Sequence, residues 1–311
     1  MKIVFAGTPE FALAPLQAIV DGGFSVVGVV TQADKPQGRK GILTPPPVKT
    51  LAEKLGIPVL QPNKIKDNLE DVKALGGDLL VTCAYGQILT QEVLDSFPLG
   101  VWNIHAGLLP FYRGASPIQS CILNGETETG VSVMRTELGL DTGDVLLVEK
   151  TEITPTETYG ELSGRLSVLG GKAIVKGLRL LASGEYTLIK QGEEGARTVR
   201  KISKEQAKID FSRSMKEIVN LVRGMNPAPV AYAQTETGLL NVYRAEPAVE
   251  FALEEGAIGE IVCDIPKKGL VVKCGDGAVR LTEVQATGGK RMKGSDFLNG
   301  RKVQKGQVFV C

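Results

Sequence analysis

Histidine and tryptophan are almost absent from this chain, and cysteine never occurs as a close pair. The sequence contains one histidine, His105, one tryptophan, Trp102, and five scattered cysteines with no Cys-x-x-Cys pair. Zinc sites in proteins are built from clustered His and Cys side chains. We therefore expect no metal site. An odd, scattered set of cysteines also favours reduced thiols, so we expect a cytoplasmic protein.

Two further features are missing: a long apolar run and a glycine-rich dinucleotide fingerprint. No apolar run approaches the roughly 20 residues of a membrane helix, and the first residues do not resemble a signal peptide. We expect no membrane contact. The turn after the first predicted strand, Gly7-Thr8-Pro9, has a single glycine. A Gly-x-Gly-x-x-Gly motif lets the backbone approach a pyrophosphate, and its absence argues against a nicotinamide or flavin cofactor.

Charge is nearly balanced over the chain but is unevenly distributed. The formal net charge is +1, with 43% apolar and 23% charged residues, which is typical of a globular protein. Residues 1–200 hold 19 Lys/Arg and 22 Asp/Glu, a balance of −3, whereas the rest holds 17 and 13, a balance of +4. This asymmetry is compatible with a polyanionic partner, and equally with chance variation between two domains.

The order of apolar patterns predicts an α/β domain followed by a small β domain. A strand at Lys2–Ala6, a helix with an apolar face and a strand at Phe24–Val30 form a βαβ opening. This opening is typical of an open, mostly parallel, twisted sheet of the Rossmann type. A long helix follows at Thr156–Ala182, which the pair Gly170-Gly171 could interrupt.

Beyond an amphipathic helix at Met215–Met225, the pattern changes to short strands separated by turns. Five such strands are typical of a small barrel of the OB type. We therefore predict an N-terminal domain at 1–184, a linker at 185–205 and a C-terminal OB-like domain at 206–311. The predicted strands are Val230–Gln234, Leu239–Ala245, Ile258–Cys263, Leu270–Lys273 and Ala278–Val284.

The strongest candidate for chemistry is the end of the predicted strand Val101–His105. Asn103 and His105 are two residues apart, so their side chains point to the same side of an extended strand. Gly107 and Pro110 then end regular structure. Open α/β sheets bind ligands at the carboxyl ends of their strands. A histidine hydrogen-bonded in the core is the alternative, but the nearby carboxamide favours a functional site.

Two loops add candidate groups. Residues 31–47 form a connection far longer than the usual ~2–6 residues, and Lys35, Arg39 and Lys40 make it basic. The loop either contacts phosphate or is simply solvated. Residues 137–144 are glycine-rich and contain Asp141 and Asp144. This second loop could bring a carboxylate to the mouth of the sheet, or form a local turn in which the aspartate bonds its own backbone.

These motifs together resemble the folate-dependent formyltransferases. The general resemblance is carried by Asn103–Pro110 and Gly139–Asp144. Further segments are similar to the branch of that family that acts on methionyl-tRNA, and the resemblance spans nearly the whole chain, second domain included. Those segments are Phe5–Phe11, Ala84–Gly86, Arg113–Ala115, Ile202–Asp210 and Asn226–Pro229.

The resemblance implies transfer of a formyl group from 10-formyltetrahydrofolate to the α-amine of methionyl initiator tRNA, needed for translation initiation. The folate is a co-substrate, so no bound cofactor is expected, and we expect a monomer. The family usually has serine where this chain has Gly107. The implied catalytic residues are Asn103, His105 and Asp141, the folate contacts Ile88, Gly107, Leu108, Leu109 and Pro110, the tRNA contact Arg39, and the methionine contact Phe11.

Each implied role has a physical basis. Asn103 can donate to the oxyanion of a tetrahedral adduct. His105 can add a second donor or shuttle a proton, and Asp141 would orient the imidazole and favour its protonated form. Phe11 could equally be a core residue of the first helix.

Two other functions stay open at this stage. The chain could formylate a small amine such as a sugar nucleotide, although the basic loop and basic second domain disfavour this. It could also be a non-catalytic RNA-binding protein, which would leave the Asn/His/Asp set without a purpose.

Overall fold

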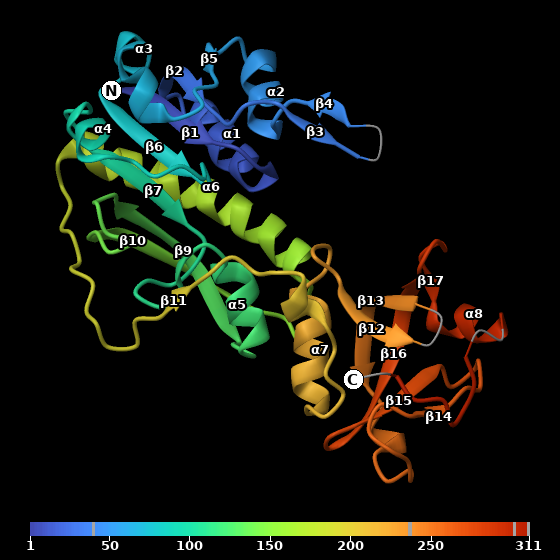
Figure 1. Ribbon diagram of the computed structural model, residues 1–311. Helices are drawn as coiled ribbons and strands as arrows, with labels where there is room; N and C mark the ends of the chain where they lie inside the picture. The colour runs from blue at the N-terminus through green and yellow to red at the C-terminus, as the bar shows by residue number, and fades with distance from the viewer. Residues whose placement is uncertain (39–40, 236–237, 301–302, 310–311) are drawn as a thin grey trace. The chain divides into compact units, whose positions relative to one another are not determined.

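The computed structural model describes residues 1–38, 41–235, 238–300 and 303–309, and the chain forms two compact units (Figure 1). Unit 1 comprises Met1–Pro117, Glu128–Glu152 and Ser163–Val199. Unit 2 comprises Ile118–Thr127, Ile153–Leu162 and Arg200–Cys311. The predicted domain limits at residues 184 and 206 stay a prediction. Within the described ranges, no helix is long and apolar enough to cross a membrane.

Unit 1 is built on a mostly parallel sheet, as the βαβ opening predicts. Among the described residues its strand order is β10-β9-β7-β6-β1-β2-β5, and β9 alone runs opposite to the other six strands. β6 is buried throughout, as expected for a central strand covered on both faces. The strands are β1 (Lys2–Gly7), β2 (Ser25–Val30), β5 (Val59–Leu60), β6 (Leu79–Cys83), β7 (Val101–His105), β9 (Glu128–Arg135) and β10 (Val145–Glu152).

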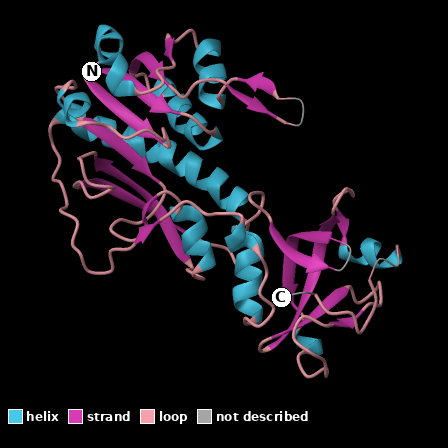
Figure 2. Ribbon diagram, viewed as in Figure 1, coloured by secondary structure: helices cyan, strands magenta, loops and turns pink. Residues whose placement is uncertain are grey.

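Helices pack against this sheet (Figure 2). On one face, an apolar cluster joins strand residues such as Val4 and Leu80 to Val72 and Phe97. The helical elements of the unit are η1 (Glu10–Ala12), α1 (Leu13–Asp21), α2 (Pro47–Lys54), η2 (Ile65–Asn68), α3 (Leu69–Ala74), α4 (Gln91–Asp95) and most of α6 (Tyr159–Ser183).

The predicted interruption of the long helix at Gly170-Gly171 is wrong, because α6 is continuous from Tyr159 to Ser183. The two glycines allow close packing instead. A Cβ on Gly171 would lie 2.9 Å from the Cβ of Ala18 and 3.0 Å from the carbonyl oxygen of Ala14. The glycine pair therefore lets α6 approach α1 closely rather than breaking the helix.

The long basic connection at 31–47 contains regular structure that the sequence did not predict. β3 (Lys35–Gln37) pairs antiparallel with β4 (Ile42–Thr44). At its base, the Lys49 ammonium forms an ion pair of 3.0 Å with Asp34. Arg39 and Lys40 lie outside the described residues.

Unit 2 contains the antiparallel β domain predicted from the second half of the chain. In the part that the structure describes, the strand order is β12-β13-β16-β15-β14, with β17 on β16. α7 begins at a capping box in which Ser214 and Glu217 satisfy each other's backbone N–H groups. The elements are α5 (Pro117–Leu123), η3 (Glu205–Ala207), α7 (Met215–Gly224), β12 (Ala231–Thr235), β13 (Gly238–Pro247), η4 (Val249–Phe251), β14 (Ile261–Cys263), β15 (Leu270–Cys274), β16 (Gly277–Ala286), β17 (Met292–Lys293) and α8 (Gly294–Asn299).

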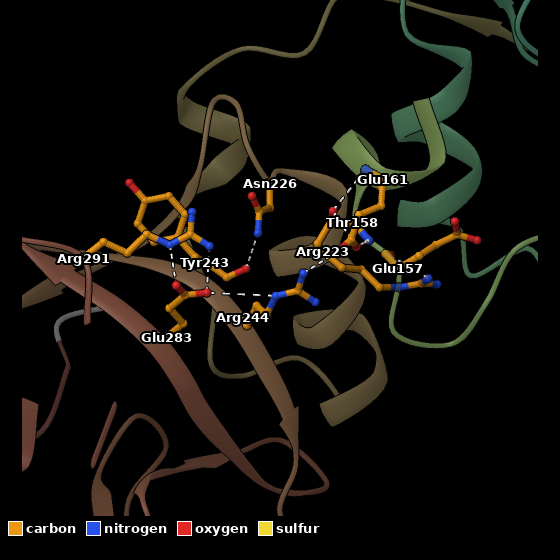
Figure 3. A network of polar contacts seen from close by, with 9 residues as sticks. All are labelled: Glu157, Thr158, Glu161, Arg223, Asn226, Tyr243, Arg244, Glu283 and Arg291. Carbon is orange, nitrogen blue, oxygen red and sulfur yellow. Dashed lines mark hydrogen bonds and ion pairs between the residues drawn. The ribbon is translucent and has the colours of Figure 1, made fainter. Parts of the chain in front are cut away.

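Segment 153–162 joins unit 2 through a network of polar contacts (Figure 3). The Arg244 guanidinium lies 2.5 Å from Glu161 and 4.0 Å from Glu283. Glu283 in turn accepts two hydrogen bonds, of 2.6 and 2.7 Å, from Arg291. Arg223 donates to the carbonyl oxygen of Thr154 at 3.1 Å. Unit 2 therefore includes a segment that precedes the predicted linker by more than twenty residues.

Candidate active site

The imidazole of His105 lies at the end of β7, as the sequence predicts. Val101–His105 forms a strand paired with β6 on one side and β9 on the other. His105 is 4% exposed, whereas Asn103 is half-buried. The two side chains share one side of the strand because side chains alternate along it. The carboxamide and the imidazole thus both sit at the carboxyl end of a central strand.

The two ring nitrogens of His105 have different partners. Nε2 lies 3.1 Å from the carbonyl oxygen of Tyr112. Because a carbonyl only accepts, this contact is a hydrogen bond in the tautomer that carries its hydrogen on Nε2. Nδ1 faces Asp141, whose Oδ2 lies 3.5 Å away. The structure therefore brings together His105 and Asp141, which are far apart in the sequence.

Burial has the largest effect on the pKa of His105. Burial lowers the pKa of His105 below its ordinary value of 6.5, and this effect outweighs Asp141 and the Tyr112 carbonyl, which both raise the pKa. Asp141 thus acts on the pKa of His105 in the expected direction, and the opposing effect of burial is larger. Both partners of the ring, the Tyr112 carbonyl and the Asp141 carboxylate, only accept hydrogen bonds, so a neutral imidazole can donate to one of them at a time.

The lowered pKa of His105 predicts that acid destabilises the folded protein well above the range where carboxylates titrate. Between about pH 7 and pH 5, the unfolded chain takes up a proton at His105 more readily than the folded chain does, so the free energy of unfolding falls with pH. His105 is the only histidine, so His105→Gln should remove this slope. Denaturant unfolding of both proteins across this range checks it, and equal slopes would contradict it.

Asp141 is held in place by the backbone of its surroundings. The N–H of Gly114 donates to Oδ2 of Asp141 at 2.7 Å. Asp141 itself has a φ of 51°, in the left-handed region that non-glycine residues rarely adopt. The loop needs glycine at Gly143, because a Cβ there would lie 2.0 Å from the carbonyl oxygen of Arg135. The conformation of the loop that carries the carboxylate is therefore determined by close backbone contacts.

The carboxamide of Asn103 is oriented by Thr82 on the neighbouring strand β6. The Thr82 hydroxyl donates to Oδ1 of Asn103 at 2.9 Å. This contact turns the other end of the amide, the NH₂ group, away from Thr82. Within the residues that the structure describes, the Asn103 NH₂ makes no hydrogen bond, so its donors remain available for a substrate oxygen.

Ser132 on β9 fixes the loop after His105. Its hydroxyl, fully buried, donates to the carbonyl oxygen of Gly107 at 2.7 Å and accepts from the N–H of Leu109 at 3.2 Å. A Cβ on Gly107 would lie 3.1 Å from Nε2 of His105 and 3.3 Å from the Cβ of Pro117. A serine there, as the resemblance leads one to expect, would require the imidazole or Pro117 to shift by a few tenths of an ångström.

The other residues predicted to contact a substrate differ in their exposure to solvent. Leu108, Leu109 and Pro110 are half-buried, whereas Ile88, on the loop after β6, is 91% exposed. Phe11 lies in η1 and is half-buried, and its carbonyl oxygen accepts a hydrogen bond of 2.7 Å from Ser167. The role predicted for Arg39 concerns a residue outside the described ranges.

Sequence reasoning missed Thr82 and Ser132, although a signal for both existed. Each is a hydroxyl residue inside a strongly apolar strand run, at Leu79–Cys83 and Val131–Met134. A polar group buried in such a strand must find a hydrogen-bond partner. Both residues find theirs at the His105 site. No group of His, Cys, Asp and Glu able to hold a metal ion occurs among the described residues.

Comparison with known proteins identifies the family. A model described as formyl transferase matches residues 1–178, and one described as formyl transferase, C-terminal domain, matches residues 201–302. The chain belongs to the formyl transferase family. The resemblance found in the sequence is thereby confirmed, and the protein is a transferase.

Relatives of this family member match it along nearly its whole length. A methionyl-tRNA formyltransferase from Neisseria meningitidis is 44% identical over 310 residues, covering 98% of this chain and 99% of that protein. One from Geotalea uraniireducens is 43% identical, covering 99% and 98%. The solved structure of WlaRD, a sugar 3N-formyl transferase with dTDP and 5-N-formyl-THF, superposes with a TM-score of 0.65 at 20% identity, covering 90% and 96%. That likeness shows a shared fold.

Proposed function

We propose that this family member transfers the formyl group of 10-formyltetrahydrofolate to the α-amine of methionyl initiator tRNA. The observation that carries the proposal is the 44% identity to a methionyl-tRNA formyltransferase over 98% of the chain, both units included. The site supports the same chemistry, because it offers a hydrogen-bond donor and a proton acceptor at one strand end.

Asn103 is the proposed oxyanion donor. Attack of a neutral amine on the formyl carbon forms a carbon–nitrogen bond and leaves negative charge on the formyl oxygen. The Asn103 NH₂, oriented by Thr82, can donate to that oxygen. A donor already fixed before the reaction stabilises the adduct without reorganisation.

His105 is the proposed proton carrier, and Asp141 is proposed to stabilise its protonated form. In the adduct, the attacking nitrogen holds an extra proton, and the bond to the folate N10 must break. Neutral His105 can take the proton from the attacking nitrogen at Nδ1, and Asp141, 3.5 Å away, stabilises the imidazolium. The imidazolium then gives this proton to N10 as the bond between the formyl carbon and N10 breaks, so that the amide keeps the formyl group and tetrahydrofolate leaves.

The folate would bind against exposed apolar side chains around this strand end. Ile88 is 91% exposed, and the loop that carries Asp141 also presents Leu138 and Leu140, 67% and 60% exposed. Apolar side chains with few polar groups are typical of small-molecule sites. Ser132 already accepts from the Leu109 N–H, so the proposed contacts at Gly107–Pro110 involve the side chains of Leu108, Leu109 and Pro110 and the second lone pair of the Gly107 carbonyl oxygen.

A formylation assay tests the proposed function directly. The protein is incubated with 10-formyltetrahydrofolate and methionyl initiator tRNA, free methionine, or an amino-sugar nucleotide. We expect formyl transfer to the charged tRNA and none to the two small amines. Transfer to the amino-sugar nucleotide without transfer to tRNA would support the alternative enzyme, and no transfer at all would contradict the proposal.

Replacing the Asp141 carboxylate should lower both the pKa of His105 and the rate. The charge of Asp141 raises the pKa of His105, so Asp141→Asn should move the imidazole titration to lower pH. We expect kcat to fall by about 10²- to 10⁴-fold, the range of acid–base catalysis, with tRNA affinity unchanged. Asp144→Asn on the same loop is the control. NMR titration of the single imidazole and formylation kinetics check both effects, and an unshifted titration would contradict the role.

A further inference from the structure

Residues 189–199, which we call the strap, lie across the loop that carries Asp141. Ile189 pairs with Val145 through two backbone hydrogen bonds of 2.9 Å. Farther along, β11 (Thr198–Val199) pairs in parallel with β8 (Arg113–Gly114). In Figure 1 the strap belongs to the yellow trace that leaves α6 and reaches β11. Both ends of the strap are thus fixed to unit 1 beside the active site.

Gln191 is the residue of the strap that contacts the Asp141 loop. Its NH₂ group donates to the carbonyl oxygens of Asp141 at 2.8 Å and of Gly143 at 2.7 Å. Its Oε1 accepts from Nε of Arg113 at 3.0 Å. Both donor hydrogens and the oxygen of the amide are therefore used, and two of the three contacts hold the backbone on either side of Thr142.

Arg113 ties Gln191 to the rest of the strap. Its side chain is 8% exposed, and it also donates to the carbonyl oxygen of Gly192 at 3.3 Å and pairs with Glu193 at 3.4 Å. The next residue, Gly114, holds the Asp141 carboxylate through its N–H. Asp141 is therefore held twice, at its backbone by Gln191 and at its carboxylate by β8, which the strap itself pairs with.

This double support matters because the conformation of Asp141 is unfavourable on its own. A φ of 51° at a non-glycine residue persists only where surrounding contacts determine it. Without Gln191, the loop loses the two side-chain hydrogen bonds that hold its backbone on either side of Thr142. The carboxylate would then move away from Nδ1 of His105.

We propose that Gln191 is a positioning residue for formyl transfer, which holds residues 141–143 so that the Asp141 carboxylate stays beside His105. The expected effects on kcat rest on the proposed function. The expected effect on the position of Asp141, and so on the pKa of His105, does not. Gln191 touches neither the imidazole nor a reacting atom, and it acts only through Asp141.

The kinetic test compares Gln191→Ala and Gln191→Glu with Glu194→Gln, an exposed neighbour on the strap. Gln191→Glu keeps the size of the side chain but directs an oxygen, in place of the NH₂ group, at two carbonyl oxygens. We expect both Gln191 variants to lose about 10- to 100-fold in kcat, as small misplacements of catalytic groups do, with KM for both substrates unchanged. Glu194→Gln should behave as the wild type. A wild-type kcat in both Gln191 variants would overturn the proposal.

A double-mutant cycle separates positioning from general damage to the fold. Because Gln191 acts through Asp141, Gln191→Ala should cause no further loss of kcat in an Asp141→Asn background. The same loss in both backgrounds would contradict the proposal.

A third readout does not depend on activity. Among the described residues, Asp141 is the charged group that raises the pKa of His105. Gln191→Ala should therefore lower the pKa of the imidazole, as Asp141→Asn does. An unchanged titration would overturn the positioning role even where the proposed substrate proved wrong. Inactivity of the wild type with methionyl-tRNA, together with a shifted titration in Gln191→Ala, would overturn the proposed function alone.

Discussion

His105→Gln should reduce formyl transfer by about 10²- to 10⁴-fold while leaving tRNA binding intact. Glutamine can present a donor to the carbonyl oxygen of Tyr112, which lies 3.1 Å from Nε2 of His105 in the wild type. It cannot, however, accept a proton near neutral pH as Nδ1 can. The substitution therefore removes the proton step and preserves the local hydrogen bond. Single-turnover kinetics and equilibrium tRNA binding measure the two effects separately.

The control for this variant is its stability. His105 is buried, so a loss of activity caused by misfolding would appear as a loss of cooperative unfolding at neutral pH. We expect the His105→Gln protein to unfold cooperatively. A folded variant with a wild-type single-turnover rate would remove His105 from the mechanism.

Asn103→Ala should lower kcat by about 10²- to 10³-fold, the usual loss when one oxyanion donor is removed. The carboxamide is half-buried at the strand end, and its NH₂ is the group we assign to the formyl oxygen. Because that interaction forms in the adduct rather than in the bound substrates, KM should change little. Steady-state kinetics with methionyl-tRNA and 10-formyltetrahydrofolate measure both constants.

Thr82→Val provides a graded comparison. This substitution keeps the shape of the side chain but removes the hydroxyl that donates to Oδ1 of Asn103 at 2.9 Å. The NH₂ donor is retained but less well oriented, so the loss in kcat should be smaller than in Asn103→Ala. If Asn103→Ala retained full activity, the oxyanion role would be wrong.

The sequence alone was sufficient to predict the parallel sheet and the strand that ends at His105. The βαβ opening and the apolar run before Asn103 are local patterns, and the parallel sheet they predict is present. Asp141 was predicted to be catalytic because its loop motif resembles that of the folate-dependent formyltransferases, and not because of its spacing from His105 in the sequence. Its distance of 3.5 Å from His105 depends on how β9 and β10 place the loop, which no local pattern encodes.

Other features depended on contacts between distant segments. Gln191 lies in a polar, glycine-rich stretch without periodicity, so nothing local marks it as a partner of Asp141. Unit 2 also includes residues 118–127 and 153–162, and it does so because of tertiary contacts such as the ion pair between Glu161 and Arg244. The upward effect of Asp141 on the pKa of His105 was predicted, whereas the larger downward effect of burial was not, because burial cannot be judged from sequence spacing.

The most direct test of the mechanism is a double-mutant cycle of His105→Gln and Asp141→Asn, measured as the single-turnover rate of formyl transfer to methionyl-tRNA. If the carboxylate acts only by stabilising the protonated imidazole, the double variant should be no slower than His105→Gln alone, because Asp141 has nothing left to stabilise. Losses that multiply in the double variant would show that the two residues act independently, and would contradict the proposed role of Asp141.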